Sequence, residues 1–237
     1  MSQDANKSAS TAYDVTRSMT RVHGIDLHHV LEGDTKRPTL VLINMASHNL
    51  TCWEVVLEPL LEHFQILRFD LRGSGKSGWS DKAQFNFAQY ADDLAGLMQN
   101  LSIKSAFVVG VAYGARTAAQ FALRHPTMLS GLGMFDVSLT APADQGHQAA
   151  LGAKAMTMLN DAGIAAPKRQ KYWRFYEDRD AALACHTAHQ RESETMAALP
   201  AITAPTLVAC GRQDMNLDSA QKIAELIPGA AFEVMEM

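Results

Sequence analysis

The segment Gly110-Val111-Ala112-Tyr113-Gly114 has the spacing of a G-x-S-x-G nucleophile elbow, but it carries alanine where such an elbow carries serine. An elbow of this kind is a sharp strand-to-helix turn that presents a hydroxyl for attack on a carbonyl carbon. The two glycines suit a turn that leaves no room for side chains. Because a methyl group cannot attack a carbonyl, the segment predicts the geometry of an elbow without its usual chemistry.

The elements on either side of this turn support the prediction. Residues 105–109 form a short apolar run typical of a buried strand, and residues 115–123 have the composition of a helix. Strand, turn and helix follow one another without a gap. We therefore expect Ala112 at the apex of the turn.

The rest of the chain alternates between strands and helices, which predicts an α/β protein with a doubly wound, mostly parallel sheet. The predicted strands are 17–23, 25–32, 39–44, 65–70, 105–109, 129–135, 206–211 and 231–235, and the predicted helices are 53–63, 87–101, 115–123 and 219–227. The first two strands form a hairpin around His23-Gly24. Residues 138–200 contain no strand pattern and are interpreted as an inserted helical cap. The core then comprises 17–137 and 201–237, after a disordered tail over 1–16.

Composition limits the function to a small-molecule protein. The chain has 237 residues, 47% of them hydrophobic, and a net charge of -4 without any run of Lys or Arg. Neither nucleic acid nor a membrane is expected as a partner. Three widely spaced cysteines and a polar N-terminus without an apolar segment favour a cytoplasmic protein without structural disulfides. No cofactor and no metal is expected, and the oligomeric state is left open.

Four segments, in order along the chain, resemble the α/β-hydrolase superfamily from Arg17 to Met237. They are Leu42–Ser47 after the third strand, the D-x-R-G-x-G-x-S turn Asp70–Ser77, the elbow, and Pro205–Asp214. The first segment is similar to that of the enol-lactone hydrolase-like subset.

The resemblance implies roles for individual residues. It implies an α/β-hydrolase fold with Ala112 at the nucleophile position and Asp214 as the acid that orients a histidine base. Asp136, after the preceding strand, is the alternative acid. The oxyanion donors would be the backbone N–H groups of Ala46 and Tyr113, which survive any change of side chain. Asp70 and Arg72 are expected to hold the glycine-rich turn rather than to contact substrate.

The resemblance also implies a histidine after Asp214, and none follows it, because all nine histidines lie at or before His189. A final helix is missing as well, and its loss should expose apolar surface on the last strand. We expect a fragment cut at residue 237, with a complete but degenerate homologue as the alternative. Ala112 is either natural or introduced.

Three side chains on loops near the predicted pocket could replace the missing groups. Cys52 lies before Trp53 at a helix start, which would lower a thiol pKa, although a buried apolar role is the commoner case for cysteine. His48 could reach the pocket from the oxyanion loop, although a surface-facing position is the commoner case for a loop histidine. The Tyr113 ring is expected to pack beside the elbow. His48, Cys52 and Trp53 are the predicted substrate-binding residues.

Two features of the predicted cap invite other interpretations. Cys185, His186 and His189 have the types of zinc ligands, but no further ligand is visible in the sequence, so no metal is predicted. Residues 168–174 are basic and aromatic, and the acidic residues that follow favour a solvated helix face over an anion site.

The sequence therefore predicts a protein descended from a serine hydrolase of small esters, lactones or related carbonyl compounds, inactive as written. Two alternatives use the same fold. The first is a binding or sensing protein for a small molecule, and the second is a cofactor-independent oxygenase or lyase, which would also need the histidine.

Overall fold

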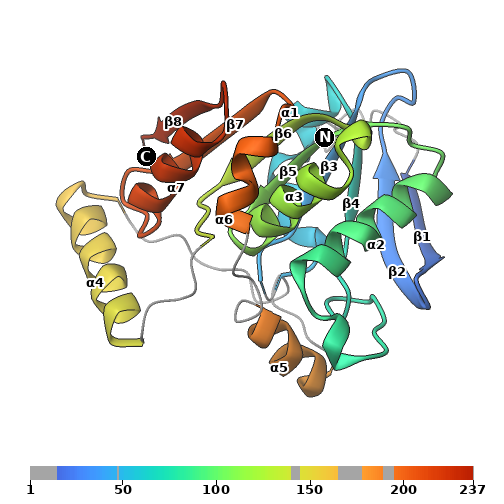
Figure 1. The fold of residues 1–237 in the computed structure, drawn as a ribbon, viewed down its shortest axis with the longest axis horizontal. Helices are drawn as coiled ribbons and strands as arrows, with labels where there is room; N and C mark the ends of the chain where they lie inside the picture. Colours follow the sequence, from blue (N-terminus) through green and yellow to red (C-terminus); the bar gives the residue numbers. More distant parts are fainter. Residues whose placement is uncertain (1–14, 47, 140–144, 165–177, 189–194, 237) are drawn as a thin grey trace, which may run out of the picture.

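The computed structural model describes residues 15–46, 48–139, 145–164, 178–188 and 195–236. Eight strands form one sheet in the order β1-β2-β4-β3-β5-β6-β7-β8 (Figure 1). The strands are β1 (Val15–Val22), β2 (Ile25–Glu32), β3 (Thr39–Ile43), β4 (Gln65–Phe69), β5 (Ala106–Val111), β6 (Leu129–Phe135), β7 (Thr206–Gly211) and β8 (Ala231–Met235). β2 is antiparallel to β1 and β4, and the other neighbouring pairs are parallel. The predicted mostly parallel α/β sheet is confirmed.

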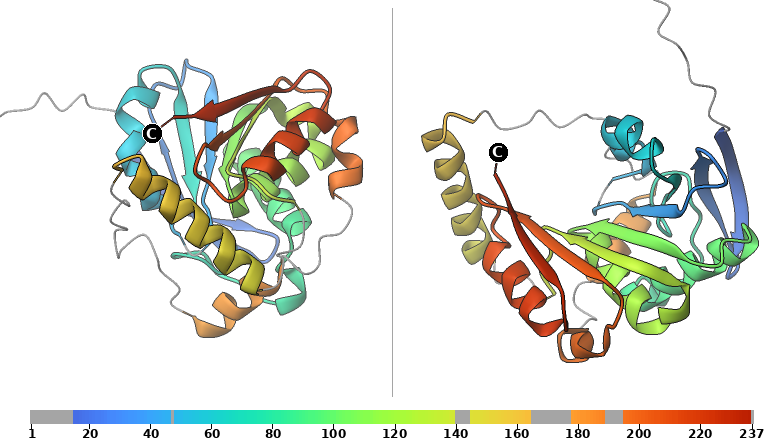
Figure 2. Two further views of the ribbon diagram at one scale, coloured as in Figure 1. Left: turned by 90° about the vertical axis from the view of Figure 1, so that its left-hand side faces the viewer. Right: turned by 90° about the horizontal axis from the view of Figure 1, so that it is seen from above.

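Helices cover the two faces of this sheet unequally. The α-helices are α1 (Leu57–Leu61), α2 (Phe87–Asn100), α3 (Tyr113–Arg124), α4 (Gln145–Asp161), α5 (Arg179–Thr187), α6 (Thr195–Ala198) and α7 (Leu217–Leu226), and the 3-10 helices are η1 (Leu50–Val56), η2 (Lys82–Gln84), η3 (Pro126–Met128) and η6 (Leu199–Ala201). α2, α3, α6 and α7 lie on one face, and α1 lies on the other (Figure 2). The large apolar core forms under α2 and α3.

Local structure departs from the sequence prediction at two places. The predicted helix 53–63 is a 3-10 helix, η1, followed by the short α1. Pro59 has no N–H and is tolerated only in the first turn of an α-helix, so the α-helical part begins at Leu57. β1 begins at Val15, two residues before the predicted strand, because Val15 and Thr16 already pair with β2. The remainder of the predicted tail, residues 1–14, lies outside the described residues.

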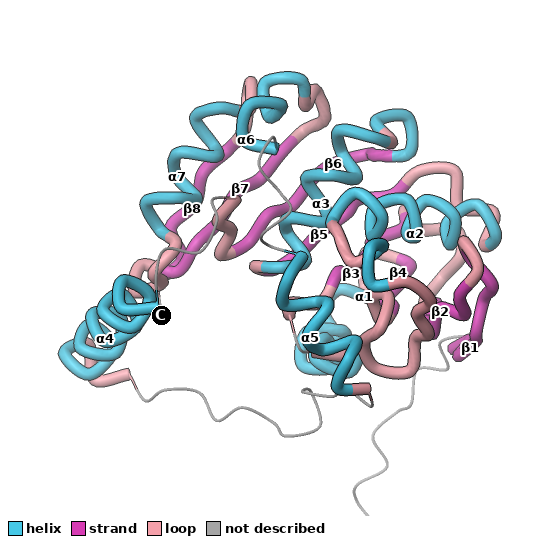
Figure 3. The backbone as a smooth tube through the Cα atoms, turned by 60° about the horizontal axis from the view of Figure 1, so that its bottom comes forward, coloured by secondary structure: helices cyan, strands magenta, loops and turns pink. Residues whose placement is uncertain are grey.

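The described helices between β6 and β7 differ in how they meet the core. α5 packs Ala181, Ala184 and Cys185 into the large core cluster. α4 lies beyond the β8 end of the sheet (Figure 3), where Lys154 and Met158 face the loop after β7. Residues 168–174 and His189, and the side chain of His186, lie outside the described residues.

The glycine-rich turn after β4 is held by the carboxylate of Asp70, as predicted. Its two oxygens accept hydrogen bonds from the backbone N–H of Leu50 at 2.7 Å and of Lys76 at 2.9 Å. Gly75 has φ +50°, and a Cβ atom there would lie 2.1 Å from Asp70 Oδ2. Arg72 is fully buried and pairs through two nitrogens with Asp93 on α2. Two buried charged side chains near its start therefore anchor the turn, and Asp70 also holds its far end through the N–H of Lys76.

The sheet face that carries α1 has an apolar groove of about 440 Å³. Apolar side chains and backbone line it, from Leu40, Leu60, Phe64, Phe107, Val109, Gly131, Leu132, Gly133, Phe135, Pro205, Thr206 and Leu207. Phe107 and Leu207 are each 37% exposed, and Met235 on β8 is exposed to the same degree. Apolar surface is thus open on this face over β3, β5, β6 and β7, whereas none of the groove's lining residues lies on β8. No helix in the described part of the chain has both the length and the hydropathy to cross a bilayer.

Gly75→Ala should lower the free energy of unfolding by about 3 kcal/mol or more, because the new methyl group meets the buried Asp70 carboxylate in a left-handed backbone conformation. Gly229→Ala is the matched control, since Gly229 has φ +74° but nothing within 4 Å of the added Cβ. That variant should lose only about 1 kcal/mol from backbone strain. Urea denaturation of both variants measures the difference, and equal losses would contradict the steric argument.

Candidate active site

The turn between β5 and α3 has the geometry of an elbow. Ala112 has φ 51° and ψ −105°, a backbone conformation that non-glycine residues rarely adopt. Its N–H donates to the carbonyl of Phe135 at 2.9 Å, which ties the turn to the end of β6. Strain of this kind persists only where the surroundings enforce it. The alanine therefore stands in the conformation that would project a reactive side chain.

The two flanking glycines are required by close backbone contacts. A Cβ on Gly110 would lie 2.3 Å from the Gly114 carbonyl carbon, and one on Gly114 would lie 2.3 Å from the carbonyl oxygen of Ile43. β3 pairs in parallel with β5, with Ile43 opposite Gly110. The loop that follows β3 thus leaves the sheet directly beside the elbow, and this loop contains Ala46.

Asn44 holds the loop after β3. Its side chain is fully buried, donates to the Phe69 carbonyl at 3.0 Å, and accepts from Trp53 Nε1 at 2.7 Å. Cys52 Sγ lies 3.9 Å from the same amide oxygen. Trp53 and Cys52 therefore pack against the base of the loop. The sequence analysis did not assign this role to Asn44, although a buried amide directly after an apolar strand was a usable signal.

Tyr113 connects the elbow to α5. Its side chain is buried, and its hydroxyl group lies 3.0 Å from the Tyr90 hydroxyl and 3.1 Å from the carbonyl oxygen of Cys185. Burial raises the pKa of the phenol well above its ordinary value. The ring packs beside the elbow, as expected, and its neutral hydroxyl joins α5 to the core.

The two candidate acids lie together at the carboxyl ends of neighbouring strands. Asp136 follows β6, and Asp214 lies in the loop after β7. Ligand atoms of both carboxylates and of Cys210 all lie within 4.8 Å of one another. Asp136 accepts from the backbone N–H of Gly211 at 3.2 Å, and Asp214 accepts from that of Asn216 at 2.7 Å. The structure therefore brings both predicted acids to one place.

This acidic group is the only set of metal-ligand types that the described residues gather so closely. Burial, followed by the charges of Asp214 and Asp136, raises the pKa of the Cys210 thiol above its ordinary value. Burial raises the pKa of Asp214, and the Asp136 charge adds to this effect. A protonated thiol is a poor metal ligand. The group therefore consists of a buried, protonated thiol beside two carboxyl groups that are each held by a backbone N–H.

None of the described histidine side chains bonds to Asp136 or Asp214. His48 is 6% exposed, which corrects the expected surface-facing position, and its Nδ1 lies 2.8 Å from the Ala46 carbonyl oxygen. The carbonyl at that distance orients the imidazole toward its own loop. His28 bonds to Asp70 at 2.8 Å.

Cys52 is not an activated nucleophile. Burial, followed by the negative charge of Asp70, raises the pKa of its thiol to about 12. The expected lowering by a helix N-terminus is wrong, because the element that begins at Leu50 is a 3-10 helix and the thiol is removed from water. Cys52 is thus a small buried side chain.

Comparison with known proteins agrees with this geometry. A family model described as "alpha/beta hydrolase fold" matches residues 38–144. The fold matches the enol-lactonase from Burkholderia xenovorans LB400 with a TM-score of 0.74 at 23% identity, covering 93% of this chain and 91% of that one. The chain has the α/β-hydrolase fold.

Among curated relatives of this α/β-hydrolase-fold protein, RutD of Stutzerimonas stutzeri is named for a proposed carbamate hydrolase activity. It is 28% identical over 235 residues, which cover 89% of this chain and 86% of RutD. An α/β-hydrolase enzyme, MGS-M2, from a Medee basin deep-sea metagenome library has a TM-score of 0.75 at 20% identity, covering 92% of this chain and 89% of that one.

In this α/β-hydrolase-fold protein, Asp214→Asn should raise the Tm at pH 7. Because the folded-state pKa of Asp214 is raised, the folded state binds more protons than the unfolded state, and stability falls as pH rises through the folded pKa. The neutral amide lacks this penalty, and its advantage should shrink as the pH approaches the ordinary aspartate pKa of about 3.9. Thermal melts between pH 4 and 7 measure the gap. The exposed Asp161→Asn is the control, and a gap that widens toward pH 4 would contradict the assignment.

Native protein should leave Cys52 unmodified by iodoacetamide at pH 8, because a thiol with a pKa of about 12 is almost entirely protonated there. All three cysteines are buried and should be alkylated only after unfolding in urea, which serves as the control. Peptide mass spectrometry follows each site. Rapid labelling of Cys52 in the folded chain would show that its thiol is activated.

Proposed function

We propose that this chain descends from a serine hydrolase of small esters, lactones or related carbonyl compounds such as carbamates, and that Ala112 leaves it without turnover by the serine mechanism. The observation that carries the proposal is Ala112 at φ 51°, in the position from which a serine would attack. The surrounding frame supports it. Such a reaction needs a tight elbow, oxyanion donors and an acid. The corresponding features here are the close glycines, the loop after β3, and the acids at the ends of β6 and β7.

The relatives support the carbonyl substrate class. RutD is named for carbamate hydrolysis and the Burkholderia protein for an enol-lactone. Both substrates contain a carbonyl carbon bonded to a heteroatom leaving group. Attack on such a carbon requires a nucleophile, a base and donors for the oxyanion. The backbone N–H groups of Ala46 and Tyr113 would be the donors here.

The chemistry that remains without a nucleophile is small. Where a triad is removed from a serine hydrolase, the oxyanion donors and substrate binding retain about 10³ to 10⁴-fold acceleration over water. Asp214 and Asp136 accept hydrogen bonds from backbone groups, and no described histidine bonds to either of them. The acids therefore have no base to orient among the described residues.

A second candidate function is binding or sensing of a small carbonyl compound. The specific observation in its favour is that the elbow keeps its strained backbone although alanine gains no reactivity from it. A ligand carbonyl could still accept hydrogen bonds from the backbone donors. An oxygenase or lyase on this fold, the further alternative, gains no support because it too needs a histidine at the acids.

Ala112→Ser should not restore hydrolysis. We expect kcat/KM for p-nitrophenyl acetate, a small lactone and a small carbamate to stay within about tenfold of the Ala112 chain, because an unassisted serine hydroxyl is a weak nucleophile. Ala112→Gly is the control, since it removes the methyl group without adding a hydroxyl.

A gain of about 10³-fold or more in Ala112→Ser, absent in Ala112→Gly, would show that a base is present and would overturn the account of inactivity. Calorimetric titration of the Ala112 chain with the same compounds separates the two candidate functions. Saturable binding without product favours the binding protein, whereas neither binding nor turnover of any of these compounds would contradict the proposed substrate class.

A further inference from the structure

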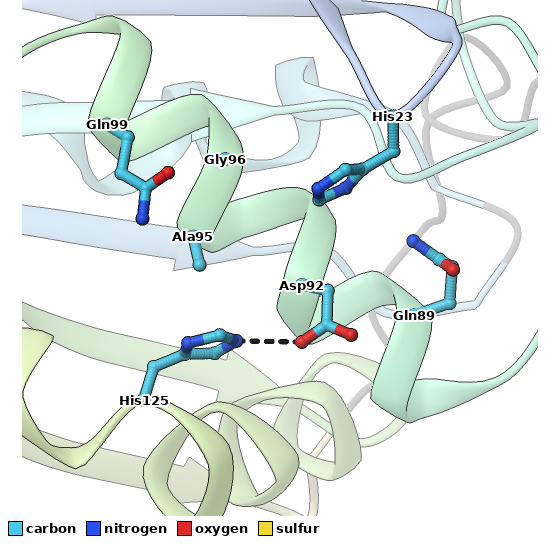
Figure 4. Close-up of a pocket in the computed structure, with 7 residues that line it drawn as sticks. All are labelled: His23, Gln89, Asp92, Ala95, Gly96, Gln99 and His125. Carbon is cyan, nitrogen blue, oxygen red and sulfur yellow. Dashed lines mark hydrogen bonds and ion pairs between the residues drawn. The ribbon is translucent and has the colours of Figure 1, made fainter.

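A polar cleft lies between the β1–β2 turn, α2 and the end of α3. It has a volume of about 310 Å³ and is lined by His23, Gln89, Asp92, Ala95, Gly96, Gln99 and His125 (Figure 4). His125 follows the last residue of α3, whereas the elbow precedes the first. The helix has 12 residues, so the cleft is about 18 Å from the elbow at 1.5 Å per residue. It is therefore a separate site from the one described above.

On one side of the cleft, His23 is oriented by a buried carboxylate. Its Nδ1 lies 3.2 Å from Asp93 Oδ1, and Asp93 is itself held by two nitrogens of Arg72 at 2.7 and 2.9 Å. An ionised carboxylate only accepts hydrogen bonds, so Nδ1 must carry the proton. In the neutral imidazole, the lone pair of Nε2 is then left as an acceptor.

His125 repeats this arrangement on the other side. Its Nε2 lies 2.8 Å from Asp92 Oδ1, and Arg124 donates to both oxygens of Asp92 at 2.9 and 2.6 Å. Burial opposes ionisation of Asp92, but the hydrogen bonds from Arg124 and His125 outweigh it and lower the pKa of the carboxyl. Asp92 is thus an ionised acceptor. In the neutral imidazole, the proton on His125 Nε2 leaves the lone pair on Nδ1.

The two glutamines and the floor of the cleft complete the site. Gln89 Nε2 donates to Asp93 Oδ1 at 3.0 Å, which leaves the amide oxygen of Gln89 as an acceptor. Gln99 is exposed, and its amide has no partner among the described residues. A Cβ on Gly96 would lie 3.3 Å from His23 Cε1, so the ring rests against this glycine. Figure 4 shows both rings and the Gln99 amide around Ala95.

The internal hydrogen bonds therefore use most of the donors of this cleft and leave acceptors, although Gln89 keeps its second N–H. His23, His125 and Gln89 each donate one N–H to a carboxylate of α2. The Gln99 amide alone keeps both of its N–H donors and its oxygen acceptor. A bare metal ion does not suit the cleft as built, because the ligand atoms of its histidines and Asp92 are not gathered within 4.8 Å in the described structure. A ligand with several N–H donors and no acceptor does.

We propose that this cleft binds a guanidinium group, either of a small molecule or of an arginine side chain. The guanidinium is planar, carries five N–H donors in a fixed fork and has no acceptor, which complements the lone pairs left on His23, His125 and Gln89. The exposed part of Asp92 faces the cleft and favours a cation. The small floor at Ala95 and Gly96 leaves space for a flat group.

The test is calorimetric titration of the full chain with agmatine, which carries a guanidinium, and with N-carbamoylputrescine, in which a urea replaces it on the same chain. We expect saturable 1:1 binding of agmatine and binding of N-carbamoylputrescine at least about tenfold weaker, because the urea is uncharged and its oxygen would face acceptors. A capped Gly-Arg-Gly peptide distinguishes the source. Tighter binding of the peptide than of agmatine indicates a partner's arginine, and the reverse indicates a small molecule.

Variants of cleft residues locate the binding. His23→Ala and Gln99→Ala should each weaken agmatine binding by about tenfold or more, since each loses one hydrogen bond to a charged group. His63→Ala is the matched control, because His63 is also an exposed histidine but lies after α1, away from the cleft. Circular dichroism melts check that each variant is folded.

Two results would overturn the proposal. The first is no saturable heat from either agmatine or the peptide at millimolar concentrations. The second is binding that His23→Ala and Gln99→Ala leave unchanged while both remain folded, which would place the ligand elsewhere on the chain.

Discussion

Close contact between the backbones of the elbow and of β3 is the constraint on which the rest of the site depends. Gly110 and Gly114 have no side chains, so the backbone can pack so closely that an added Cβ at either position would lie 2.3 Å from another backbone atom. The N–H of Ala112 also donates a hydrogen bond to the carbonyl of Phe135. This contact places the loop after β3, the start of α3 and the end of β6 around one point. The geometry is made by backbone atoms, so it persists when the residue at the apex is alanine.

The same sheet edge explains why two acids meet. Parallel strands end at one edge, and β6 and β7 are neighbours, so residues that follow them converge although they are far apart in the chain. Burial next to a second carboxylate then raises the pKa of Asp214. The electrostatics of the site follow from strand order, and they differ from those of an acid paired with a histidine.

Charged side chains on α2 serve two different purposes. Asp93 closes a buried pair with Arg72 and so fixes the glycine-rich turn, while Asp92 pairs with Arg124 at the surface. Each carboxylate also orients one histidine. Asp93 thus holds the glycine-rich turn, whereas Asp92 lines the polar cleft. Two adjacent aspartates can do this because neighbouring residues of a helix point in directions about 100° apart.

The sequence by itself determined the elbow and the strands that flank it, because glycine spacing and apolar runs report local backbone requirements directly. The acid positions came from the family resemblance instead. The sequence predicted one α-helix over 53–63, but Pro59 and tertiary packing divide this region into the 3-10 helix η1 and the short α-helix α1. Only the tertiary structure decided the raised thiol pKa of Cys52, the meeting of Asp136 with Asp214 and the cleft between His23 and His125. Burial, strand order and helix packing set these features, and each of them depends on residues distant in the chain.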